Sequence, residues 1–116
     1  MDKSFPIEYG NWSFKTLVTI QGIPGIPPRT ISFADCLTPR HRIPVELTKN
    51  CSMTPPEIAG KTLSYTMTCT RGVSRARFIY WKRHMTGTIE TRLSGPQNLI
   101  VDERIRGRYT GPCHRS

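Results

Sequence analysis

The chain contains 116 residues, of which 36% are hydrophobic, and it carries a formal net charge of +9. This length predicts one domain that covers residues 1–116. Nine glycines and ten prolines favour many short elements joined by turns over a few long helices. No stretch approaches the length of a membrane span, so no transmembrane segment is expected.

Apolar and polar residues alternate along much of the chain, which is the pattern of half-buried antiparallel strands. The alternation is clearest at residues 63–69, where the even positions are all Ser or Thr. It recurs near the N-terminus, where Trp12 and Phe14 share a face, and near the C-terminus, where Ile105 and Tyr109 do. About seven strands are predicted, near residues 10–21, 29–36, 51–55, 62–70, 75–82, 86–94 and 98–110.

The connections between these segments indicate the fold class. Gly60-Lys61 and residues 95–98 supply tight turns between neighbouring strands. Residues 38–50 lack a clear period and are compatible with a short helical turn that opens at Thr38-Pro39. We therefore predict a mainly β fold, an antiparallel up-and-down meander that closes into a small barrel or a strongly curved sheet. A β-sandwich is the alternative.

Four cysteines, at positions 36, 51, 69 and 113, are spaced too widely for a typical zinc site. An even number of cysteines in a small domain predicts two disulfides and an oxidising compartment. We favour Cys36–Cys51 with Cys69–Cys113, because the first bridge closes the long irregular stretch and the second holds the C-terminus. The rival bridge Cys51–Cys69 is also open, because these two residues are symmetric about Gly60 and would face each other across a hairpin.

The positive charge is concentrated in residues 70–116, which hold ten basic and three acidic side chains. Arg104, Arg106 and Arg108 alternate with other residues, so they project from one face of a strand, about 7 Å apart at each step. Such a row attracts polyanions, including phospholipid headgroups and anionic envelope polymers. The alternative is a solvated face with no specific ligand.

A second group of arginines accompanies this row. Arg75, Arg77 and Arg83 are expected on one face of the predicted strand 75–82, and Trp81 would share that face. Arginine beside an exposed aromatic residue is typical of surfaces that bind phosphate-bearing polymers. The opposite orientation, with Trp81 inside and Phe78 outside, is the alternative.

Residues 22–28 contain three prolines and cannot join a central sheet. Ile23, Pro24, Gly25 and Ile26 then either fold over the mouth of the barrel as a plug or line an entrance for an apolar ligand. We favour the plug, because seven strands of this length leave little interior volume.

Catalytic and metal-binding patterns have little support. The three histidines are scattered, and no nucleophile–His–Asp order accompanies them, so no enzyme activity and no cofactor are expected. Asp102 and Glu103 are adjacent and should point to opposite faces of a strand. Cys113-His114 with His84 and Met85 contains ligand types suited to copper, but a disulfide at Cys113 is the preferred interpretation, so no metal is expected.

Several motifs resemble those of a known family. Tyr9-Gly10-Asn11-Trp12 resembles the P-G-L-W opening of the small exported proteobacterial proteins grouped as domain-of-unknown-function family 3617. Residues 23–30 resemble its M-P-G-M-P-x-x-P-x-T loop, and Cys36-Leu37-Thr38-Pro39 resembles its C-V-T-P element. Residues 65–69 match its W-x-M-x-C positions. The similarity covers about residues 8–113, the expected ordered core, and it implies a periplasmic or secreted β domain without an established activity.

These observations together predict an exported binding module for an apolar or anionic cell-envelope ligand. A structural or protein–protein interaction domain is the alternative, and a soft-metal-binding protein is a further one. The first ten residues lack the apolar core of a signal peptide, so we expect the chain to represent the mature protein with its leader removed. Nucleic acid is not expected as a partner of an oxidised exported protein, and a monomer is expected.

Overall fold

The computed structural model of the chain describes residues 7–43, 51–95 and 98–113. Within these ranges all the regular secondary structure is β-strand, which confirms the mainly β prediction there. The described residues form no helix that could cross a membrane. The strands are β1 (Gly10–Gln21), β2 (Arg29–Leu37), β3 (Cys51–Met53), β4 (Glu57–Ala59), β5 (Thr62–Cys69), β6 (Gly72–Trp81), β7 (His84–Leu93) and β8 (Ile100–Gly111).

The predicted strand 51–55 differs from the structure, because β3 ends at Met53 and a second short strand, β4, which the sequence did not predict, follows at Glu57–Ala59. Pro55 and Pro56 lie between them and have no backbone N–H to donate to β5, so the ladder is interrupted. The turn at Gly60-Lys61 is where the sequence predicts it, between β4 and β5, and Gly60 has a φ of 61°. Glycine reaches this left-handed conformation without steric cost.

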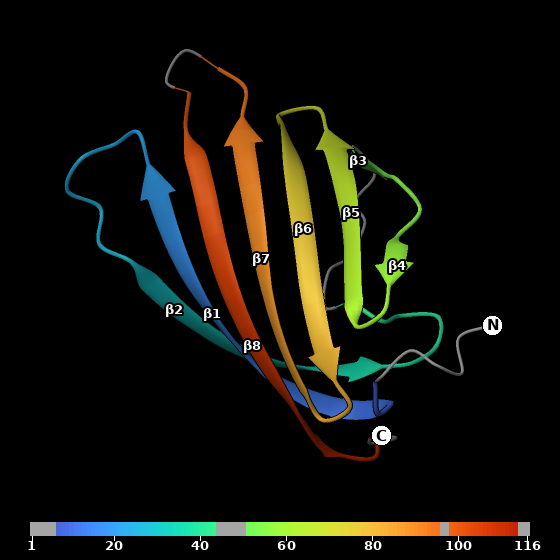
Figure 1. The fold of residues 1–116 in the computed structure, drawn as a ribbon. Helices are drawn as coiled ribbons and strands as arrows, with labels where there is room; N and C mark the ends of the chain where they lie inside the picture. The colour runs from blue at the N-terminus through green and yellow to red at the C-terminus, as the bar shows by residue number, and fades with distance from the viewer. Residues whose placement is uncertain (1–6, 44–50, 96–97, 114–116) are drawn as a thin grey trace.

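The strands form one antiparallel sheet in the order β2-β1-β8-β7-β6-β5-β3, and β4 also pairs with β5 (Figure 1). The first and last strands are therefore neighbours, as closure of a meander requires, and the sheet is open between β2 and β3 instead. The predicted closure into a barrel is not observed, because among the described residues β2 pairs with β1 alone. The opposite edge of the sheet consists of two three-residue strands, β3 and β4, which are separated by prolines. These short strands have few backbone N–H and C=O groups with which β2 could pair.

The sheet is instead strongly curved, which is the second of the two predicted forms, a small barrel or a strongly curved sheet. β1 and β6 are separated by β8 and β7, so a flat sheet would hold them roughly 14 Å apart. Yet the rings of Trp12 on β1 and Tyr80 on β6 have centroids only 6.4 Å apart. The two halves of the sheet thus face each other across an interior lined by alternate residues of each strand.

Two glycines on the inner face help the aromatic core to pack. Gly107 lies opposite Phe14, and Gly87 lies opposite Phe78. A Cβ atom at Gly107 would lie 2.5 Å from the Phe14 ring, and one at Gly87 would lie 2.2 Å from the Phe78 ring. Because these positions have no side chain, each ring lies across the neighbouring backbone, and both rings are fully buried.

The disulfides are Cys36–Cys113 and Cys51–Cys69, so the favoured pairing is wrong and the rival bridge is the one observed. Cys51 lies directly opposite Cys69 in the register of β3 and β5, with Cα atoms 4.0 Å apart. Cys36 on β2 meets Cys113 because β2 and β8 flank β1 on its two sides. Cys113 still holds the C-terminus, but against β2 rather than β5.

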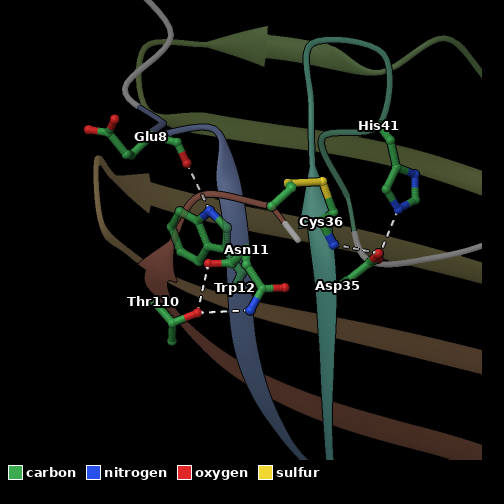
Figure 2. Close-up of a disulfide and its surroundings, with 8 residues drawn as sticks. Glu8, Asn11, Trp12, Asp35, Cys36, His41 and Thr110 are labelled. Atoms are coloured by element: carbon green, nitrogen blue, oxygen red, sulfur yellow. Dashed lines mark hydrogen bonds and ion pairs between the residues drawn. A yellow bond between two sulfur atoms is a disulfide. The ribbon is translucent and has the colours of Figure 1, made fainter. Parts of the chain in front are cut away.

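Polar contacts around Cys36–Cys113 join the ends of β1, β2 and β8 (Figure 2). The Trp12 indole donates a hydrogen bond of 2.8 Å to the Glu8 carbonyl. Asp35 accepts one from the Cys36 amide and lies 2.8 Å from the His41 ring nitrogen Nε2. A tight turn joins Thr38 to His41 through two backbone hydrogen bonds, where the sequence allowed a helical turn. Residues 44–50 lie outside the described ranges.

Candidate functional site

The convex face of the sheet carries all five arginines that the sequence predicts for an anion site. Arg75 and Arg77 lie on β6, and Arg104, Arg106 and Arg108 lie on β8; all five are exposed. The two strands share β7 as a neighbour, and Thr88 of β7 pairs with both Arg77 and Arg104. Residues in one such row point to the same side of a sheet. The two predicted groups are therefore parts of one surface.

Strand pairing adds two residues that the sequence did not assign to an anion site. Lys15 of β1 lies directly opposite Arg106, and His84 of β7 lies directly opposite Arg108. Both are exposed. The periodicity of β1 places Lys15 on the outer face, but only the pairing of β1 with β8 places it beside the arginines. We call the following residues the basic face: Lys15, Arg75, Arg77, His84, Arg104, Arg106 and Arg108.

The carboxylates on the same side of the sheet do not neutralise the arginines of the basic face. Asp102 accepts a hydrogen bond from Gln21, and Glu90 pairs with Arg92 at 3.4 Å. Arg75 lies opposite Glu90 in the register, but no ion pair joins them. Among the described residues, none of the five arginines forms an ion pair with a carboxylate. Their charges face solvent and are available to an anion.

A shallow depression of about 480 Å³ lies in the middle of the basic face. Arg77, Arg104 and Arg106 border it, together with the hydroxyls of Thr86 and Thr88. Its other described lining residues are Ile79, Gly87 and Ile105, and none of the described residues contributes a carboxylate to it. Guanidinium groups form forked hydrogen bonds to phosphate oxygens, and hydroxyls add further donors. The depression therefore has the chemistry of a phosphate-binding surface.

Apolar side chains are interspersed with the charges. Trp81 is 43% exposed and Leu17 is 41% exposed, and both belong to the outer face. The orientation with Phe78 outside is therefore excluded, because Phe78 is fully buried in the core. A hydrated polyanion gains little from such apolar groups, whereas the interface of a lipid bilayer accommodates them.

Arg83 does not join the basic face, contrary to the prediction. It lies in the turn between β6 and β7, and its guanidinium is 5.6 Å from the centroid of the Tyr109 ring. β6 ends at Trp81, and Lys82 has a φ of 50°, so the period of two stops before Arg83. The cation–π contact holds this arginine at the end of the sheet.

The proline-rich loop does not plug the interior. Pro24, Gly25 and Ile26 are exposed, Ile23 is partly buried, and none of them belongs to the core cluster. An added Cβ at Gly25 would meet no atom within 4 Å. Figure 1 shows the connection between β1 and β2 extending away from β5 and β6. The loop is open to solvent because its prolines cannot extend the ladder of β1 and β2.

The soft-metal residues are not brought together. Met85 is buried in the core, and neighbouring His84 points to the outer face. Cys113 is in a disulfide, and His114 lies outside the described ranges. Where the chain is described, no group of three or more His, Cys, Asp or Glu side chains is arranged to hold a metal ion.

Comparison with known proteins identifies a family without an assigned activity. The sequence model of DUF3617, described as "Protein of unknown function", matches residues 7–113. The chain therefore belongs to this family, as its motifs indicate. Searches of curated proteins and of solved structures found no match.

Proposed function

We propose that this DUF3617 protein is a non-enzymatic binding domain of the cell envelope that docks on anionic phospholipid surfaces through its basic face. The observation that carries the proposal is the register of β1 and β8, which places Lys15 directly opposite Arg106. Like charges in directly opposite positions destabilise a sheet. Arg104 and Arg108 flank Arg106 on the same face and add to this repulsion. An anionic ligand bound to the basic face would relieve it.

Phospholipid is preferred over a soluble polyanion because of the apolar residues on this face. Trp81 and Leu17 expose about two fifths of their surface beside the arginines. At a membrane surface, arginines pair with lipid phosphates while tryptophan lies at the level of the headgroups. The other ligand expected from the sequence, an apolar molecule held by residues 23–26, has less support because that loop is exposed and apart from the core.

An exported location is part of this proposal. Two disulfides are compatible with an oxidising compartment, and bacterial envelope membranes contain anionic lipids. We propose a periplasmic or secreted protein that acts as a monomer. Size-exclusion chromatography with light scattering tests the oligomeric state, and a stable dimer that covers the basic face would contradict this assignment.

The experiment is co-sedimentation with vesicles of phosphatidylcholine alone or mixed with phosphatidylglycerol. We expect binding only to the mixed vesicles, with affinity falling steeply as salt rises, because surface charges are screened beyond about 10 Å at 0.1 M salt. The test variant replaces Arg104, Arg106 and Arg108 by Gln.

The matched control replaces three exposed turn residues outside the basic face, Arg40, Lys61 and Arg71, and removes the same net charge. Each cation near an anionic membrane contributes roughly 1 kcal/mol. The test triple should therefore lose more than tenfold in affinity, while the control triple loses much less. Equal losses, or no binding by wild type at low salt, would favour the alternative of an interaction domain with a solvated basic surface. Competition by polyphosphate without vesicle binding would assign a soluble polyanion instead.

A further inference from the structure

The inner face of the sheet contains a second feature that the basic face does not explain. A cavity of about 240 Å³ lies between the two halves of the curved sheet. Its apolar walls come from both halves: Phe33 of β2 on one side, Tyr65 and Met67 of β5 on the other, and Ile89 and Ile105 between them. The hydroxyl residues Thr16, Ser74 and Thr91 and the carboxylate of Glu103 complete the lining. An apolar cavity of about 150 Å³ holds one benzene molecule, so this one has room for a ring and a short substituent.

One carboxylate lies in this apolar wall. Glu103 of β8 points inward beside Ile89 and Val18, whereas its neighbour Asp102 points outward, as the sequence predicts for adjacent residues of a strand. Within the described ranges Glu103 forms no hydrogen bond or ion pair. The nearest cation in the register is Arg29, which is separated from Glu103 by Val18. An inward carboxylate without a partner is unfavourable for folding.

The other polar groups of the cavity are already engaged or neutral. The Ser74 hydroxyl lies 2.8 Å from the Thr91 hydroxyl, within hydrogen-bond distance. Burial raises the pKa of Glu103, and burial together with the charge of Glu103 raises the pKa of Tyr65 to about 12. A cation held beside Glu103 would favour its charged form and offset the cost of its burial. The cavity thus combines an apolar wall with one acceptor for a cation.

We propose that the inner cavity binds a small organic ammonium ion, with an aryl or short alkyl body against Phe33, Met67 and Ile89 and its ammonium group on the Glu103 carboxylate. The volume limits the body to about one ring. The ligand class follows from the sign of Glu103, the only formally charged group among the described residues that line the cavity. A fatty acid or other anion is disfavoured, because its carboxylate would meet Glu103 in a site of reduced polarity.

This site is distinct from the basic face and does not depend on lipid binding. The whole protein carries a net charge of +9, which repels cations at long range. Retention of an ammonium ion would therefore require a local contact, because the long-range field of the protein repels cations.

The experiment is an NMR titration of the full, oxidised chain with benzylammonium and with benzyl alcohol, its neutral analogue. Two variants remove one negative charge each from adjacent positions: Glu103→Gln inside the cavity and Asp102→Asn on the outer face. We expect benzylammonium to shift the amide signals of Ser74, Ile89 and Thr91, and to bind more tightly than benzyl alcohol. Glu103→Gln should weaken benzylammonium binding about tenfold, the loss expected for a charge-assisted hydrogen bond, and leave benzyl alcohol unchanged.

Asp102→Asn should bind both probes like the wild type. Equal weakening by the two variants, shifts confined to outer-face residues, or no binding to the wild type would each overturn the proposal. Loss of the fold does not obscure the result, because Glu103→Gln removes an unpartnered charge and should stabilise the protein. Thermal melts show whether both variants remain folded.

Discussion

The repulsion between Lys15 and Arg106 yields a prediction about stability as well as binding. Directly opposite residues on antiparallel strands have Cβ atoms roughly 5 Å apart. Two unit charges at this separation in water repel by roughly 0.8 kcal/mol. Long side chains can separate their charged ends, so we expect about 0.5 kcal/mol from this pair. Arg104 and Arg108, two positions away on the same face, add a similar amount.

Arg106→Gln should therefore stabilise the isolated protein by about 1 kcal/mol at low salt, which corresponds to a rise of about 4 °C in melting temperature for a domain of this size. Thermal melts followed by circular dichroism measure the rise. In about 1 M salt the screening length is roughly 3 Å, and the gain should disappear. Lys61→Gln serves as the control, because Lys61 is an exposed turn residue with no like charge opposite. The same Arg106→Gln variant should bind anionic vesicles more weakly.

A double-mutant cycle isolates the pair. Lys15→Gln and Arg106→Gln should together stabilise the protein by less than the sum of their separate effects, because either substitution alone removes their mutual repulsion. If Arg106→Gln leaves the melting temperature unchanged or lowers it at low salt, the repulsion does not exist. If the gain persists in high salt, its origin is packing rather than charge.

Two further predictions concern the disulfides and Glu103. By the loop-entropy relation, removing Cys36–Cys113, with a separation of 77 residues, should lower the free energy of unfolding by about 4.5 kcal/mol, and removing Cys51–Cys69, with a separation of 18, by about 3 kcal/mol. Urea unfolding of the two Cys→Ser double variants measures this order, and a peptide joining Cys36 to Cys51 in non-reducing mapping would contradict the pairing. Because burial raises the pKa of Glu103, the folded protein binds more protons than the unfolded chain between the two pKa values, so stability should decline as pH rises through this window. Glu103→Gln should abolish that part of the decline in melts from acid to neutral pH, and an effect of equal size at every pH would show that its charge is irrelevant.

Sequence alone predicts the strands and their faces well because a period of two needs only local information. The alternation around Arg106 shows that Arg104 and Arg108 share its face, and the structure bears this out for all three. The turn at Gly60 also makes Cys51–Cys69 a candidate bridge, since equal distances from a turn place residues opposite each other. Each of these inferences uses residues that are close along the chain or related by one turn.

The order of the strands cannot be predicted from local sequence in the same way. Every strand presents the same backbone donors and acceptors, so these groups do not specify which two strands pair. β1 pairs with β8, whose paired residues lie 79 to 100 positions further along the chain, and nothing local indicates this. The bridge between Cys36 and Cys113 depends on that pairing, and so does the place of Lys15 in the basic face. Whether the barrel closes is hard to predict for a related reason. Closure depends on whether the edge strands β2 and β3 can form backbone hydrogen bonds with each other.

β8 shows how both proposed sites come from one strand. Arg104 and Arg106 point outward, whereas Glu103 and Ile105 point inward, so the sheet separates groups that would neutralise each other on a common face. A shift of one residue in the pairing would bury the arginines and expose Ile105. The aromatic core opposes such a shift, because Phe14 packs over Gly107 and a shift of one residue would place Arg106 or Arg108 opposite its ring. The packing that fixes the register therefore also fixes which charge faces which ligand.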